Sequence, residues 1–211
     1  MVIEKITGMT YDDYIHFAIL HPLGIYDMHI GNSFYDEKLE TEVRYYDEGE
    51  SIKCYSYNGS GEIVSQIYGG NDIGLLGAAG GWVASAPELL KFIVAIDGFP
   101  DKPDILTKES IELMTEQPES SKHLIGWRGT DGHGTWWRTG TLSGTTALVM
   151  RHKNEVEWVV LLNTTNKNRS RIHNELSRTM FKVLNSVKQW PEADLFNFEL
   201  EMNEGLLSIN G

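Results

Sequence analysis

The strongest constraint on the fold is a series of four strand-like segments followed by a long amphipathic helix. The segments occupy residues 123–127, 135–140, 145–151 and 157–163. Turn-forming pairs, Asp131-Gly132 and Lys153-Asn154, lie between them. Strands joined so closely pair antiparallel, because a parallel pair needs a crossover of about a dozen residues. Apolar residues then recur at helical spacing from Ile172 to Val187. The pattern predicts an antiparallel meander with a covering helix.

Helical signals dominate on both sides of a weakly patterned, loop-rich stretch, 24–81. Thr10, Ser85 and Thr107 suit helix N-caps, because their hydroxyls can accept a backbone N–H of the first turn. The expected helices run over 2–6 with Gly8 behind it, from Thr10 to Pro22, from Ser85 to Gly98 and from Thr107 through Met114. Short strands are expected at 43–46, 52–57 and 63–68. Helices, then an antiparallel sheet, then a covering helix predict an α+β fold.

Charge and cysteine content exclude several classes of function. The 211 residues carry a net charge of −12, which disfavours nucleic acid and anionic membranes as partners. Cys54 is the only cysteine, so an internal disulfide and a cysteine-rich zinc site are excluded. No apolar run approaches the ~20 residues that span a bilayer, and no signal peptide is visible. We expect one domain over 1–190 and an acidic tail of undefined structure over 191–211, and the compartment stays open.

The densest group of polar and glycine residues lies around Arg138, Thr139 and Gly140. A guanidinium and a hydroxyl in this arrangement can bind a carboxylate, and the glycine lets a ligand approach the strand. His133 and Trp136 could flank such a cleft. From these residues alone, a strand that ends in a glycine turn with a surface arginine explains the pattern better than a binding site does.

The segment 137–148, Trp-Arg-Thr-Gly-Thr-Leu-Ser-Gly-Thr-Thr-Ala-Leu, resembles the third-motif strand of serine β-lactamases and penicillin-binding proteins. It is most similar to the branch that holds class C β-lactamases, D-alanyl-D-alanine carboxypeptidases and esterases. Other segments resemble the same family in the same order. They are 3–8 with Tyr11, 21–25, 42–46, 80–85 with Leu89 and Phe92, and 158–163. The resemblance covers residues 2–165 and implies a β-lactamase/transpeptidase-like fold.

The resemblance implies hydrolysis of a peptide, a β-lactam or an ester through an acyl-serine intermediate. Thr139 would then hold the substrate carboxylate or leaving side, and the N–H of Thr141 would supply half of an oxyanion hole. Arg138 stands where the family has Lys or His. It keeps the charge, but a guanidinium does not readily exchange a proton.

Two of the family's motifs are missing from this sequence. The nucleophile belongs to Ser-x-x-Lys, and no lysine here has a serine three residues before it. Thr164-x-x-Lys167 and Thr179-x-x-Lys182 follow the third motif instead of preceding it. Ser56-Tyr57-Asn58 has the form of the second motif but follows the helix that it should precede. We therefore predict a C-terminal portion of such a hydrolase, without a catalytic nucleophile and inactive by itself.

Two other classes of function stay open. The chain could be a non-catalytic module that binds peptide-like carboxylates, or an oligomerising structural module. No metal or other cofactor is expected, because His16 and His21 lack a third ligand. The family's first strands, which would pair beside 157–163, are absent, so this apolar edge predicts a homo-oligomer.

Overall fold

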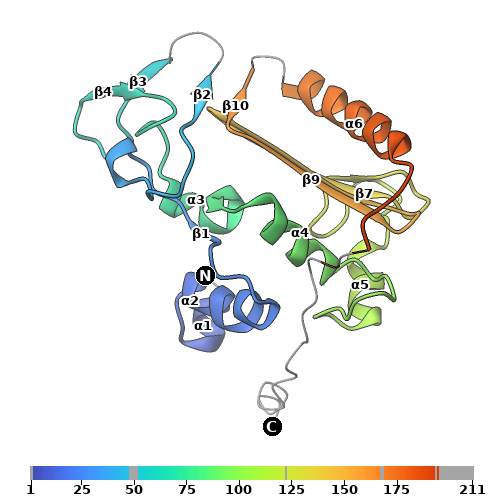
Figure 1. Cartoon of the computed structure of the whole chain (residues 1–211). Helices are drawn as coiled ribbons and strands as arrows, with labels where there is room; N and C mark the ends of the chain where they lie inside the picture. The colour runs from blue at the N-terminus through green and yellow to red at the C-terminus, as the bar shows by residue number, and fades with distance from the viewer. Residues whose placement is uncertain (1, 48–51, 122, 167–168, 193, 195–211) are drawn as a thin grey trace.

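Four antiparallel strands form the main sheet of this computed structural model, in the order β6-β7-β8-β9 (Figure 1). The strands span Gly129–Thr130, Trp136–Leu142, Thr145–His152 and Val156–Leu162. The structure describes residues 2–47, 52–121, 123–166, 169–192 and 194. The pairing runs from Trp136↔Arg151 to Leu142↔Thr145 between β7 and β8, and from Thr146↔Leu162 to His152↔Val156 between β8 and β9. The predicted antiparallel meander is therefore confirmed for its last three strands, which are β7, β8 and β9.

The prediction of a strand over 123–127 is wrong. This segment forms a tight turn in which the backbones of Leu124 and Trp127 exchange two hydrogen bonds of 3.3 Å. Gly126 adopts a φ of +82°, which suits a turn and not a strand. Leu124 and Trp127 are buried, so their apolar character reflects core packing at the turn. The strand begins two residues later, as β6.

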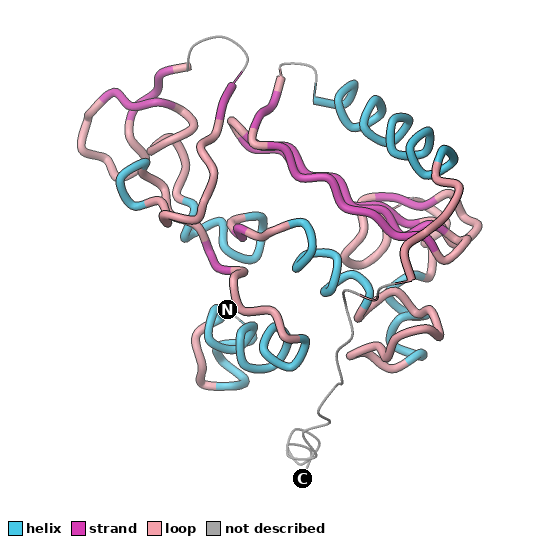
Figure 2. The backbone as a smooth tube through the Cα atoms, in the orientation of Figure 1, coloured by secondary structure: helices cyan, strands magenta, loops and turns pink. Residues whose placement is uncertain are grey.

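Helices cover both faces of the sheet (Figure 2). On one face lies α6, Arg169–Ser186, which packs Leu176, Met180 and Leu184 against Leu148, Met150 and Trp158 of the sheet. On the other face lie α4, Ala86–Val94, and α5, Lys108–Thr115. Their apolar side chains join Leu124, Trp127, Trp136 and Val149 in a second cluster. The sheet is thus the middle of three layers, and its antiparallel strands with separate helices make an α+β fold.

The three predicted N-caps are confirmed. Thr10 accepts a hydrogen bond from the N–H of Asp13, Ser85 from that of Glu88, and Thr107 from that of Ser110. The Glu88 carboxylate also accepts hydrogen bonds from the backbone N–H groups of Tyr26 and Asp27. Glu88 therefore fixes the start of α4 against the chain that follows the N-terminal helices.

The N-terminal helices form a small unit packed on α4. Helix α1, Val2–Thr7, is followed by Gly8 with a φ of +72°, and α2, Tyr11–Ile15, continues into a π-helical turn over His16–Leu20. The helix closes within 21–24, as the sequence predicts. Pro22 lies inside a 3-10 turn, His21–Leu23, and Gly24 follows with a φ of +64°. Leu20, Leu23, Ile25, Met28 and Ala95 form the core of this unit.

The weakly patterned stretch contains short paired strands. β1, His29–Ile30, pairs with β5, Trp82–Val83; β2, Tyr46–Asp47, pairs with β10, Thr164–Thr165; and β3, Lys53–Tyr55, pairs with β4, Ile63–Ser65. A 3-10 turn spans Tyr35–Glu37. The strands are shorter than predicted. Helix α3, Ile73–Gly80, was not predicted, because it contains three glycines and a kink at Gly77.

Among the described residues, no helix is long and apolar enough to cross a membrane. Most of the predicted tail, 195–211, lies outside the described residues.

Candidate functional site

Strand β7 carries the predicted carboxylate-binding residues in alternation. Side chains of successive strand residues point to opposite faces. Trp136 packs in the cluster under α4 and α5, so Arg138 projects to that same face. Trp137 packs in the cluster under α6, so Thr139 and Thr141 project to the α6 face. The guanidinium and the two hydroxyls therefore lie on opposite sides of one strand.

Arg138 is exposed and has no hydrogen bond or ion pair to any described residue. Four other arginines of the chain have partners. Arg128 contacts His123, Arg151 donates to the Asp97 carbonyl, Arg171 pairs with Glu175, and Arg44 lies over the ring of Tyr46. The charge of Arg138 is thus available to an anion.

The backbone of β7 beside Arg138 has an open edge. The N–H of Arg128 donates to the carbonyl of Trp137 over 2.9 Å, and β6 pairs only with Trp136 and Trp137. In an antiparallel strand, every second residue directs its N–H and C=O to the same side. The N–H groups of Thr139 and Thr141 therefore also face this side, where no described strand pairs with them. Two backbone donors thus lie next to the Thr139 hydroxyl.

Helix α6 brings His173 to the same strand. Its Nε2 lies 3.3 Å from the carbonyl oxygen of Gly140 and 3.4 Å from Oγ1 of Thr141. His173 is half-buried. No motif in the sequence marks this residue as part of a site. The available signal was its position three residues before Leu176, which places both on the sheet-facing side of the helix.

The turn after β7 packs against the segment around Tyr45. A Cβ at Gly144 would lie 2.9 Å from Cβ of Tyr45 and 3.1 Å from Cγ2 of Ile67. The N–H of Tyr45 donates to the hydroxyl of Tyr68 over 2.8 Å, and the Tyr45 hydroxyl donates to Glu42. Burial, and then the Glu42 carboxylate, raise the pKa of Tyr45, so this phenol stays neutral. These contacts fix one wall beside the end of β7.

The two predicted flanking residues lie elsewhere. His133 is exposed in the turn between β6 and β7, at the end of β7 away from Thr139. Trp136 is buried in the core, where the guanidinium carbon of Arg151 lies 4.2 Å from its ring centroid. The structure therefore does not bring either residue beside Thr139 and Thr141.

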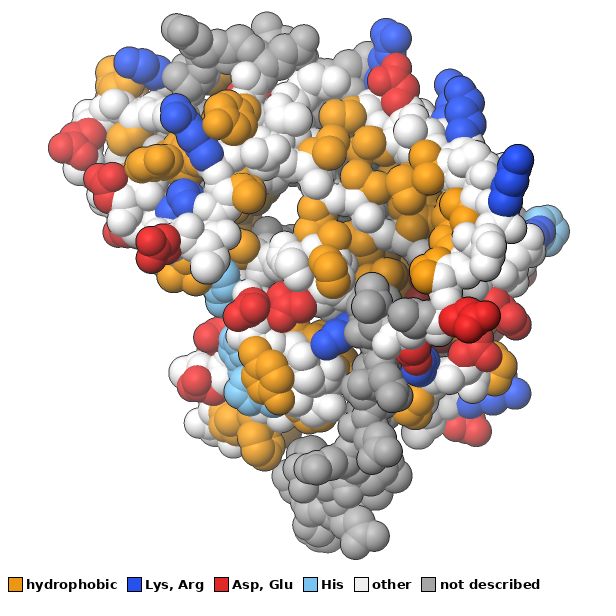
Figure 3. All heavy atoms as spheres, in the orientation of Figure 1, with side chains coloured by type: hydrophobic (Ala, Val, Ile, Leu, Met, Phe, Trp, Pro, Cys, Tyr) orange, Lys and Arg blue, Asp and Glu red, His pale blue; other side chains and the backbone are white. Residues whose placement is uncertain are grey.

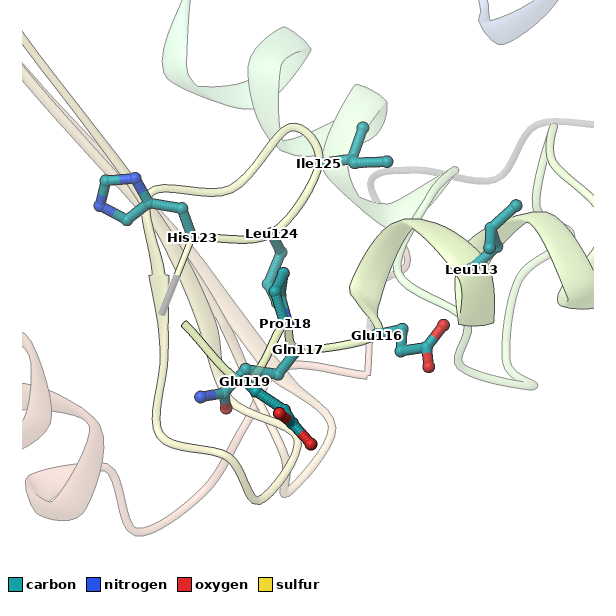
Figure 4. A pocket seen from close by; sticks show the side chains of 8 residues that line it. All are labelled: Leu113, Glu116, Gln117, Pro118, Glu119, His123, Leu124 and Ile125. Carbon is teal, nitrogen blue, oxygen red and sulfur yellow. The ribbon is translucent and has the colours of Figure 1, made fainter. Parts of the chain in front are cut away.

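A shallow cavity of about 530 Å³ lies beyond this strand, between α5 and the 116–125 loop (Figure 4). Its lining includes the carboxylates of Glu116 and Glu119, with His123 as the only nitrogen base. These carboxylates would repel the anion that Arg138 attracts. The candidate site is therefore the β7 edge and not this cavity. Within the part of the chain that the structure describes, no three His, Cys, Asp or Glu side chains are grouped to hold a metal ion.

Comparisons with known proteins give a family and a fold. The family model Beta-lactamase matches residues 1–179. No curated protein matches the sequence. D-amino acid amidase from Ochrobactrum anthropi SV3, solved with D-phenylalanine, is similar with a TM-score of 0.55 and 20% identity, over 87% of this chain and 57% of its own. An octameric penicillin-binding protein homologue from Pyrococcus abyssi has a TM-score of 0.52 and 22% identity, over 86% of this chain and 40% of its own. The chain thus spans about half the length of these structures.

Proposed function

The chain belongs to the Beta-lactamase family, and from that premise we propose that its β7 edge is the substrate-carboxylate side of a serine hydrolase site. Arg138 attracts the carboxylate of a peptide-like, β-lactam or ester ligand to this edge from the α4 and α5 side, and Thr139 donates a hydrogen bond to it from the α6 side. The N–H of Thr141 faces the oxyanion that would develop during acyl transfer. The observation that carries this proposal is the exposed Arg138, which pairs with no described residue, beside two backbone donors on an edge that no described strand covers.

One of the similar structures was solved with a ligand of this class. One of them holds D-phenylalanine, an amino acid with a free carboxylate. At 20% identity this likeness shows only the fold, so the ligand class rests on the chemistry of Arg138 and Thr139 in this chain.

The binding test compares two ligands that differ only at the carboxyl group, N-acetyl-D-phenylalanine and its C-terminal amide. We expect the acid to bind more tightly and Arg138→Gln to weaken it by about 10- to 150-fold, the equivalent of about 1.5–3 kcal/mol for a charged hydrogen bond. Chemical-shift titration at millimolar concentration suits the expected weak affinity. Arg178→Gln, an exposed arginine on α6, is the matched control and should change nothing.

The result that contradicts the carboxylate site is equal affinity of the wild-type chain and Arg138→Gln for the acid. If neither ligand binds and the chain forms a stable dimer, the structural-module alternative replaces this proposal.

The activity test follows from the missing nucleophile motif. The 211 residues contain no Ser-x-x-Lys, so no serine has a lysine one helical turn away to take its proton. We expect the isolated chain neither to hydrolyse nitrocefin or p-nitrophenyl acetate nor to be labelled by a fluorescent penicillin. Stoichiometric labelling of a serine, seen by mass spectrometry, would show that the isolated chain is an enzyme.

A further inference from the structure

One peptide unit connects His173 to the open edge of β7. The carbonyl of Gly140 and the N–H of Thr141 belong to the same planar amide and point in opposite directions. The carbonyl oxygen lies 3.3 Å from Nε2 of His173. The Arg128–Trp137 hydrogen bond shows that the backbone groups of Trp137 face the edge. Every second residue of the strand faces the same way, so the N–H of Thr141 also points to the edge where the proposed anion would bind.

The chemistry of the two atoms sets the direction of this hydrogen bond. A carbonyl oxygen only accepts, so a hydrogen bond between these two atoms requires the tautomer with the proton on Nε2 of His173. Nε2 also lies 3.4 Å from Oγ1 of Thr141, which accepts the same proton in that tautomer and would donate to Nε2 in the other.

A donor on an amide oxygen changes the other end of the amide. It draws electron density toward the oxygen, which increases the double-bond character of C–N and makes the N–H a stronger donor. This effect acts on Thr141 N–H alone, because the Thr139 N–H belongs to a different peptide unit. The contact also fixes the end of β7 against α6.

We propose that His173 is a positioning residue that strengthens the Thr141 N–H as an anion donor by hydrogen bonding to the Gly140 carbonyl. This inference rests on the proposed carboxylate site and adds a residue that acts on it through the backbone. His173 then acts through this peptide unit and not through a contact of its own with the ligand.

The test compares two amide side chains of different reach. His173→Gln places an amide nitrogen at the same number of bonds from Cα as Nε2, so it can still donate to Gly140. His173→Asn is one methylene shorter and cannot. The first readout is the chemical shift of the Thr141 amide proton and nitrogen in the ligand-free chain. The second readout is the affinity for N-acetyl-D-phenylalanine.

We expect His173→Asn to move the Thr141 amide proton upfield and to lower the affinity about 3- to 10-fold, and His173→Gln to restore most of both. Asn174→Gln, on the exposed side of α6, should leave both unchanged. Equal results for the Asn and Gln variants would overturn the proposal. They would show that the effect does not depend on whether the side chain is long enough to donate to the Gly140 carbonyl. An unmoved Thr141 amide in His173→Asn would overturn it as well.

Failure of the carboxylate site gives a different result. In that case Arg138→Gln leaves the affinity unchanged, while the ligand-free shift of the Thr141 amide still reports on His173. The polarisation of the amide and the binding function are therefore measured separately.

Discussion

At position 144 the backbone adopts a φ of +81°, a region that side chains with a Cβ rarely occupy. The same glycine also lets the β7–β8 turn approach Tyr45 and Ile67 closely. Gly144 therefore has two separate physical reasons to lack a side chain. One belongs to the turn and the other to the packing of the wall beside the candidate site.

We expect Gly144→Ala to lower the free energy of unfolding by more than the φ strain of about 1–3 kcal/mol. Gly59→Ala is the matched control, because Gly59 has a φ of +75° and no atom within 4 Å of a built Cβ. The difference between the two variants in urea unfolding measures the contact with Tyr45 and Ile67. Equal destabilisation by both would show that the wall yields to the extra methyl group.

The residues of the site differ in how far the sequence could identify them. Arg138, Thr139 and Thr141 are neighbours in the sequence, so the sequence was enough to group them. Their placement on opposite faces of β7 follows from the packing of Trp136 and Trp137 in the structure. His173 reaches Gly140 only because α6 folds back over the sheet, a tertiary contact that no local pattern contains. The open edge of β7 was also invisible, because it depends on where β6 stops.

At the scale of elements, a buried ionic cluster joins the end of α4 to strands β8 and β9. Arg151 on β8 donates through Nε to the carbonyl of Asp97 over 2.9 Å, and its guanidinium carbon lies 3.7 Å from the Phe99 ring centroid. Burial, and then the adjacent Asp97 carboxylate, raise the pKa of Glu157 on β9 to about 9. Burial also raises the pKa of Asp97 to about 6. Glu157 is therefore protonated in the folded chain at neutral pH.

This cluster predicts a stability that falls as the pH rises. Between about pH 4.5, the ordinary value of a glutamate, and about pH 9, the folded chain holds a proton on Glu157 that the unfolded chain has lost. The free energy of unfolding should therefore decrease across this window, by at most about 1.4 kcal/mol per pH unit for one proton. Glu157→Gln keeps the shape and removes the titration, so it should flatten the curve and stabilise the chain at pH 8–9.

Urea unfolding at several values of pH measures this effect. Glu112→Gln, whose side chain is exposed on α5, is the control and should leave the slope unchanged. A wild-type slope that persists in Glu157→Gln would assign the pH dependence to other groups.

Elements with strong local signals were predicted from the sequence, and elements that depend on distant contacts were not. The three N-caps, the three long strands and α6 follow from hydroxyl positions and apolar spacing. The segment 123–127 looked like a strand because its apolar residues are buried, yet Gly126 turns it. Helix α3 was missed because Gly74, Gly77 and Gly80 oppose helix formation locally, while its packing and the Asp72 cap support it.

At the scale of the whole molecule, the sheet ends at β9. This strand pairs with β8 on one side, and no described strand pairs with it on the other. Backbone N–H groups alternate between the two sides of each strand, and the registers of β7 with β8 and of β8 with β9 carry this alternation to β9. The N–H groups of Glu157, Val159 and Leu161 therefore face away from β8. Figure 3 shows hydrophobic side chains gathered over this edge and beside α6. An apolar edge with free donors and acceptors is a surface on which another strand can pair.

We propose that the isolated chain self-associates through β9, with a second copy pairing against this edge. Because strand pairing protects only amides that face the partner, exchange at Glu157, Val159 and Leu161 should slow as the protein concentration rises. The amides of Trp158 and Val160 face β8 and should exchange slowly at every concentration.

Leu161→Lys tests this edge, since a lysine on an edge strand opposes pairing with another chain. We expect it to shift the sedimentation profile at about 100 µM toward the monomer. Val183→Lys adds the same charge to a half-exposed apolar position on α6 and should leave the oligomer intact. A monomeric wild-type chain at this concentration, with fast exchange at the three outward amides, would show that β9 remains an open edge. Dissociation by Val183→Lys but not by Leu161→Lys would move the interface from β9 to α6.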